Sequence, residues 1–312
     1  MRKDEARFHF KYDLALVLIT LIWSTTFVLA KDLLSQLPPL NYLSMRFLVA
    51  ALVLALISHR IWRSIDRIAI MGGIVLGVLL YGGFFTQAIG LVYTTPAKSA
   101  FVTGVNVILV PFFSYFLMEA RITVGHIVAI TLACFGFGLL TMPQGGESIN
   151  LGDMITLLGT SFWALHIVYT GVWTRRTATQ PLLLMQLVVT ALLFLISLMV
   201  LQTLGVLPVL ASSDWPLNFK IAAQIIYLSV IATIGTILVQ TRAQRHVPAT
   251  RTGIIFSLEP AFAAFVSYLV LGERLNWRAF VGGALIIVAI IISTLDRFPY
   301  LSKAQLASEE QP

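Results

Sequence analysis

The sequence predicts an all-α integral membrane protein with ten transmembrane helices. Of its 312 residues, 58% are hydrophobic and only 11% are charged, whereas soluble proteins carry roughly 25% charged residues. The mean hydropathy is +0.89. Ten apolar runs reach the length of about 20 residues that a helix needs to cross the hydrocarbon core. Barrel strands would be shorter and would alternate in polarity, which these runs do not.

The predicted spans are joined by short loops and cover residues 13–34, 40–59, 69–92, 96–118, 123–143, 151–173, 181–204, 219–241, 248–271 and 276–295. A basic segment, MRKDEARFHFK, precedes the first span. That span is too long for the apolar region of a signal peptide and no small-residue cleavage site follows it, so it is predicted to stay in the protein. The single cysteine, Cys134, lies inside a span, which excludes a disulfide framework.

The basic residues gather on one side of the predicted membrane. Fifteen of the 21 lie at one face: Arg2, Lys3, Arg7, Lys11, Arg60, Arg63, Arg67, Arg121, Arg175, Arg176, Arg242, Arg245, Arg251, Arg297 and Lys303. The opposite loops 35–41, 144–150 and 202–218 carry none. The positive-inside rule therefore predicts that both termini are cytoplasmic. The net charge of +7 is explained by this topology, so it does not indicate a nucleic-acid partner.

The two halves of the chain resemble each other. Asp13 and Trp23 match Asp153 and Trp163 at an offset of 140 residues. The segment FFSYFLMEARI, residues 112–122, resembles AFVSYLVLGERL, residues 264–275. We therefore predict a five-helix repeat in residues 1–143, a second in residues 151–295, and a cytoplasmic tail in residues 296–312.

The repeats are predicted to be inverted. Because each contains an odd number of spans, the second must start on the opposite side of the membrane from the first. Two inverted halves can exchange conformations about a central cavity, which is the arrangement that suits alternating access.

Several short segments also resemble the EamA-type permeases of the drug/metabolite transporter superfamily, over residues 13–294: Trp23-Ser24, Arg46-Phe47-Leu48, Ser257-Leu258-Glu259-Pro260 and Gly272-Glu273-Arg274-Leu275. The resemblance implies ten helices in two inverted halves, with a cavity lined mainly by spans one, three, four, six, eight and nine. It also implies small metabolites as substrates, often amino acids or related compounds, and frequently export. Short members of the superfamily carry a Glu in the middle of their first span. This chain has none there, so their proton-exchange mechanism is not transferred to it.

Two charged residues fall well inside predicted spans, where each costs roughly 2.5–3.5 kcal/mol on insertion scales. Glu259 lies in the middle of a span and precedes Pro260, which is expected to interrupt the helix. Glu259 either titrates or binds a substrate amine, or it is a fixed strut that pairs with Arg46 or with the backbone. Arg46 is interpreted as half of a structural or gating pair with Glu259, because arginine seldom releases its proton.

Other polar and aromatic residues complete the predicted substrate cavity: Trp23, Ser24, Thr25, Thr26, Tyr81, Gln87, Thr103, Asn106, Trp163, His166, Tyr169 and Gln240, together with Glu259. Trp23 and Trp163 are deeper than the interfacial aromatic belt, which favours cavity lining. For His166 two interpretations stay open, an interior hydrogen-bonded residue or a proton carrier.

The sequence contains no HExxH, GxSxG or Walker motif and no Cys/His cluster with metal-ligand spacing. We therefore expect no enzyme activity, no metal and no cofactor. The predicted function is secondary transport of a small-molecule substrate, with export favoured, across the cytoplasmic membrane of a bacterium. The alternative is a lipid-handling protein or flippase that acts on a polyprenyl or phospholipid headgroup. Besides the bilayer, a homodimer is compatible with the sequence but is not required.

Overall fold

The computed structural model describes residues 2–57, 59–118, 123–141, 150–205, 218–271 and 277–295, and within these ranges the chain is helical with no strand. The predicted tail 296–312 and the segment Gly272-Glu273-Arg274-Leu275 lie outside the described residues. The elements, in chain order, are α1 (Arg2–Leu34), α2 (Pro39–Ile57), η1 (His59–Ser64), α3 (Arg67–Tyr93), α4 (Pro96–Thr103), α5 (Asn106–Met118), α6 (Val124–Thr141), α7 (Leu151–Trp173), α8 (Thr179–Leu204), α9 (Phe219–Ile226), η2 (Tyr227–Gly235), α10 (Thr236–Ala243), α11 (Ala249–Phe256), α12 (Glu259–Leu271) and α13 (Trp277–Leu295).

The helices follow the predicted spans closely. The run expected at 151–173 is α7 residue for residue, and most other described boundaries differ from the expected ones by a few residues. The largest difference is in α1, which begins at Arg2 instead of at residue 13. Within the described residues, seven helical segments are long and apolar enough to cross a membrane, and α6 and α13 contain shorter apolar stretches. An all-α membrane protein is thus confirmed, while the count of ten crossings stays a prediction.

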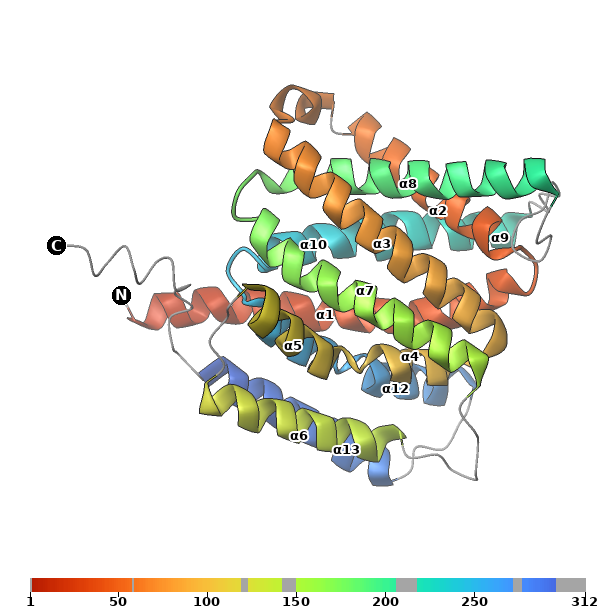
Figure 1. The fold of residues 1–312 in the computed structure, drawn as a ribbon. Helices are drawn as coiled ribbons and strands as arrows, with labels where there is room; N and C mark the ends of the chain where they lie inside the picture. Colours follow the sequence, from red (N-terminus) through yellow and green to blue (C-terminus); the bar gives the residue numbers. More distant parts are fainter. Residues whose placement is uncertain are drawn as a thin grey trace.

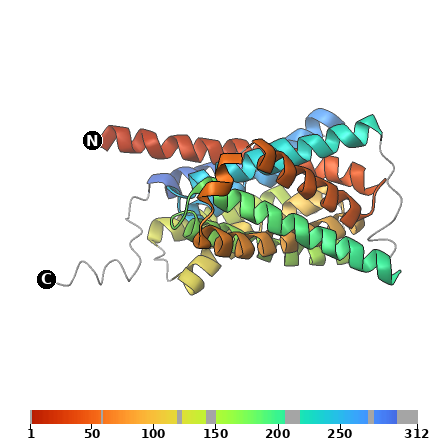
Figure 2. The same cartoon turned by 90° about the horizontal axis from the view of Figure 1, so that it is seen from above.

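The axes of the helices lie roughly along one line and are tilted against one another, while the chain direction reverses between consecutive spans (Figures 1 and 2). α3 packs along α7 on one side and along α8 on the other, and α6 pairs with α13 at the edge of the bundle. Glycines permit the close approach of α3 to α8, since a Cβ atom on Gly77 would lie 2.7 Å from the Cβ of Val189. Small residues play this role in helix packing within lipid.

Two predicted spans are broken helices of equal construction. α4 and α11 each contain eight residues, and α5 and α12 each contain thirteen. A two-residue break separates the members of each pair, Gly104-Val105 in the first half and Ser257-Leu258 in the second. The break beside Glu259 was predicted from Pro260, which is the second residue of α12, where a missing N–H is tolerated. The first break was not predicted, because residues 96–118 read as one continuous span.

The span expected at 219–241 contains a nine-residue π-helix, η2, between α9 and α10. Its wider winding is visible in the bond from the Thr233 hydroxyl to the carbonyl of Leu228, five residues earlier, at 2.8 Å. π-helical turns are rare and occur frequently at functional sites. The corresponding helix of the first half, α3, is α-helical throughout.

Candidate functional site

A cavity lies between the helices of the two halves. It is lined by Trp23, Thr26, Phe27, Arg46, Phe84, Gln87, Thr103, Asn106, Trp163, Ile167, Gln240, Phe256 and Glu259. These residues come from α1, α3, α4, α5, α7, α10, α11 and α12, with Arg46 added from α2. Eight of the thirteen predicted cavity residues are among them.

Most of the polar lining occurs in equivalent pairs. Trp23 and Trp163 are 140 residues apart, and Gln87 and Gln240 are 153 apart. The offset of 153 also relates α4 to α11 and α5 to α12. Each half therefore contributes one indole and one amide to the lining of the cavity.

Charge breaks this symmetry at two places. Arg46 is equivalent to Gln186, which is fully buried and does not line the cavity. Glu259 is equivalent to Asn106. One cation and one acid thus face a cavity whose other polar groups are uncharged, and they come from different halves of the chain.

Arg46 is held by neutral groups of both halves. Its side chain is 2% exposed. Nε donates to the Thr233 hydroxyl at 2.9 Å, and Nη2 lies 3.5 Å from the Ala232 carbonyl. Nη1 donates to the Tyr42 hydroxyl at 2.9 Å, and the guanidinium lies 4.5 Å from the centre of the Phe84 ring. η2 therefore supplies two of the three oxygen atoms that orient Arg46, and Tyr42 of α2 supplies the third.

The gating or structural pair of Arg46 and Glu259 stays a prediction. Both residues line the cavity, but no ion pair joins them among the described residues. Glu259 also has no hydrogen-bond partner in the part of the chain that the structure describes, so it is not held as a fixed strut by backbone donors there. Glu259 is the first residue of α12.

The comparison with protein families decides the identity of this fold. The model of the EamA-like transporter family matches residues 10–142 and again residues 150–295. The chain belongs to the EamA-like transporter family. It is therefore a multi-pass membrane transporter of the drug/metabolite superfamily that handles a small-molecule substrate, and members of this family are transporters rather than enzymes.

Curated relatives of this EamA-like transporter span nearly its whole length. It is 27% identical to an uncharacterized transporter of Archaeoglobus fulgidus over 91% of this chain and 85% of that protein. It is 26% identical to the uncharacterized transporter YyaM of Bacillus subtilis over 96% of this chain and 99% of that one. A protein of known crystal structure is 17% identical and superposes with a TM-score of 0.71. The match covers 91% of this chain and 95% of that protein, which shows a shared fold.

Five of the predicted cavity residues of this EamA-like transporter lie outside the cavity lining. The Ser24 and Thr25 hydroxyls donate to carbonyls three residues earlier in α1, and Thr25 also contacts the Tyr227 hydroxyl at 2.9 Å. Backbone bonds of this kind let hydroxyl side chains enter lipid at low cost. Thr26 makes the same type of bond to Trp23 and does line the cavity.

The other three predicted residues that lie outside the cavity lining are Tyr81, His166 and Tyr169. The Tyr81 hydroxyl lies 2.7 Å from the Ser197 hydroxyl, so it joins α3 to α8. His166 Nε2 lies 3.1 Å from Gln186 Oε1, and both residues are buried. Tyr169 is half-buried. Their contacts favour packing roles, and for His166 the interior hydrogen-bonded interpretation.

The two indoles of the transporter differ in their partners. Trp23 Nε1 donates to the Thr236 hydroxyl at 3.0 Å and lies 3.3 Å from the Ala232 carbonyl. Trp163 Nε1 is buried with no hydrogen-bond partner in the described residues. Trp163 packs edge-on against Phe84, with ring centres 4.5 Å apart. One indole therefore joins the halves and the other keeps its donor unused.

A buried apolar cluster adjoins the cavity and shares Ile167 and Phe256 with its lining. It contains ten buried residues of the described chain: Leu16, Ile19, Val110, Ala164, Ile167, Val168, Ala243, Val247, Ile255 and Phe256. Arg251 of α11 also forms a buried ion pair with Asp13 of α1.

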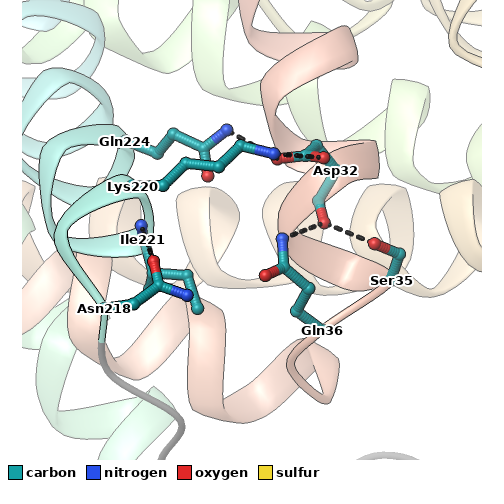
Figure 3. A network of polar contacts seen from close by, with 7 residues as sticks. All are labelled: Asp32, Ser35, Gln36, Asn218, Lys220, Ile221 and Gln224. Carbon is teal, nitrogen blue, oxygen red and sulfur yellow. Dashed lines mark hydrogen bonds and ion pairs between the residues drawn. The ribbon is translucent and has the colours of Figure 1, made fainter.

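Polar contacts join the other end of α1 to its neighbours. Asp32 accepts from Lys220 and Gln224 of α9, whose first turn is capped by Asn218 (Figure 3). The neighbouring Lys31 donates to the carbonyls of Leu91 and Thr94 at the end of α3. The end of α1 is thereby fixed between helices of both halves.

Sequence reasoning missed the apolar lining residues Phe27, Phe84, Ile167 and Phe256. Phe27 and Ile167 each lie four residues, about one helical turn, after a cavity tryptophan, and Phe84 lies three residues before Gln87. Phe256 likewise lies three residues before Glu259, so spacing from predicted residues could have found all four.

Proposed function

We propose that this chain is a secondary transporter that moves small metabolites, amino acids or related compounds, across the cytoplasmic membrane of a bacterium by alternating access. The observation that carries the proposal is the cavity itself, to which two repeats of one family model both contribute. Its floor of aromatic rings with a cation, an acid and several amides suits a compact solute with both polar and apolar parts.

The transport cycle follows from the construction of the halves. Residues 1–143 and 151–295 are proposed to be inverted repeats, with the broken helices as equivalent moving parts. Exchange of the two conformations would close the cavity on one side and open it on the other. Export is the direction that the family resemblance favours, and both termini are proposed to lie in the cytoplasm. A single copy suffices for this cycle, although a homodimer is compatible with it.

The test is a counterflow assay in proteoliposomes. A panel of amino acids is measured with and without a pH gradient, and the same vesicles are assayed for scrambling of a labelled phospholipid. We expect saturable counterflow of at least one solute and no scrambling above that of protein-free vesicles. Scrambling without solute counterflow would replace the proposal by the flippase alternative.

The orientation is tested separately by labelling single cysteines in a Cys134→Ala background. Ser35 and Arg63 are both exposed, and the positive-inside rule places them on opposite faces. The Ser35→Cys variant should react with an impermeant maleimide added outside cells. The Arg63→Cys variant should react only after the cells are permeabilised. Reaction of both from one side would overturn the proposed topology.

A further inference from the structure

Arg46 is a buried cation whose hydrogen bonds to the protein are incomplete. A guanidinium has five N–H donors. The contacts to Thr233, Tyr42 and Ala232 use one donor on each of its three nitrogens. Five minus three leaves two N–H groups, one on each terminal nitrogen, without an acceptor among the described residues.

No carboxylate of the described protein neutralises this cation. The ion pairs found there are Lys220 with Asp32 and Arg251 with Asp13, and neither includes Arg46. A buried charge normally has a partner, because its transfer out of water is costly. Since Arg46 lines the cavity, the missing partner must enter through the cavity.

The surroundings of Arg46 favour a directional anion. η2 fixes the guanidinium through the hydroxyl of Thr233, and the face of Phe84 lies 4.5 Å below it. Trp163 packs against the same Phe84 and has a buried, unused N–H. Two N–H groups on a fixed fork match the two oxygens of a carboxylate.

We propose that Arg46 is the specificity-determining residue of this transporter and binds the carboxylate of its substrate. This inference rests on the proposed function, because it assigns the anionic end of the solute in the same cavity. Glu259 and the unpartnered Oδ1 of Asn106 then face the donor end of the solute. The substrate is accordingly a carboxylic acid that also carries hydrogen-bond donors, and the asymmetry of the two halves sets its orientation.

The test compares each acid with its own amide. Thermal stabilisation of the purified transporter is titrated with a panel of amino acids and their carboxamides, all at one chloride concentration so that halide competition stays constant. In the wild type, at least one acid should bind about tenfold to 100-fold more tightly than its amide, the range expected for hydrogen bonds to a charged group. Arg46→Gln should reduce this ratio to about one, and Arg46→Lys should retain part of it.

The choice of variants separates binding from folding. Glutamine already occupies the equivalent position 186, so Arg46→Gln introduces a residue that this fold accommodates. If that variant is not monodisperse, Arg46→Lys is tested in its place, since lysine keeps the positive charge but lacks the planar pair of N–H donors of the guanidinium. Lys220→Gln removes a cation outside the cavity and should leave the ratio unchanged. A purely structural role of Arg46 would weaken acid and amide equally.

Two results would overturn the inference. In the first, Arg46→Gln leaves the ratio of acid affinity to amide affinity unchanged. In the second, no acid stabilises the wild-type transporter, or each acid stabilises it no more than its amide does. Counterflow of some solute together with either result would retain the proposed function and remove only this role of Arg46. Absence of any counterflow would remove the proposed function itself.

Discussion

Asn106 and Glu259 occupy the same position in two equally built broken helices. Each is the first residue of the second segment, each follows a two-residue break, and each lines the cavity. The chain places an amide at one of the two sites and an acid at the other. Because the surrounding helices have equal lengths, the difference in charge is a difference between side chains and not between scaffolds.

Neutralising this acid should impair transport. Glu259→Gln keeps the size of the side chain and removes its charge. We therefore expect transport to fall at least tenfold at unchanged membrane abundance, and a tenfold fall corresponds to about 1.4 kcal/mol. Asp32→Asn is the control, because Asp32 pairs with Lys220 outside the cavity. Counterflow measures transport, and immunoblotting measures the abundance of each variant in the membrane. Normal transport by Glu259→Gln would remove this residue from the site.

The buried pair of Asp13 and Arg251 should stabilise the packing of α1 against α11. The two side chains are 7% and 11% exposed. Arg251→Gln leaves Asp13 without this partner, and breaking a buried pair costs about 3–5 kcal/mol. The double variant with Asp13→Asn should lose less than the sum of the single losses, as measured by denaturation in detergent. Additive losses would show that the two charges do not interact.

The close contact of α3 with α8 should tolerate no added methyl group. A Cβ at position 77 would lie 2.7 Å from Val189 and 2.9 Å from the carbonyl oxygen of Gln186. We expect Gly77→Ala to destabilise the protein by about 1–3 kcal/mol. At Gly138, no atom lies within 4 Å of an added Cβ. Gly138→Ala should therefore be neutral or mildly stabilising, and equal melting temperatures for the two variants would contradict the packing.

Much of this organisation was predictable from apolar length and from the repeat. The ends of α7 follow from the apolar run alone, and Pro260 indicated the break before α12. The break at Gly104-Val105 was not predicted, because no proline stands beside it and residues 96–118 have the length of one ordinary membrane span. The π-helix η2 also leaves no signal in the sequence, since its residues are those of an ordinary membrane span.

The cavity was harder to predict than the fold. The offset changes from 140 to 153 between the second and third helices of each half, because α8 is longer than α2 and a longer connection follows it. The offset of 140 residues alone therefore does not reveal the equivalence of Gln87 with Gln240. Ser24, Thr25 and Tyr81 were predicted as lining because polarity in a span suggests a cavity, whereas their hydroxyls are satisfied within helices or between them.

The two cavity tryptophans should respond differently to loss of the indole N–H. Trp23→Phe removes the donor to Thr236 and to the Ala232 carbonyl, so we expect a loss of about 0.5–1.5 kcal/mol per hydrogen bond in addition to the change in size. Trp163→Phe removes no internal hydrogen bond of the described residues and should cost less. Denaturation of both variants in detergent, without added solute, measures the difference. An equal or larger loss in Trp163→Phe would contradict the assigned contacts.

The most direct test of alternating access uses a single cysteine in the cavity. Thr103 lines it from α4, close to the first helix break, and Thr103→Cys is made in the Cys134→Ala background. Its reaction with a small impermeant thiol reagent is measured in vesicles of both orientations, with and without transported solute. We expect labelling from each side of the membrane and protection by the solute from both. Labelling from one side only, or no protection, would contradict a cavity that opens alternately to the two sides.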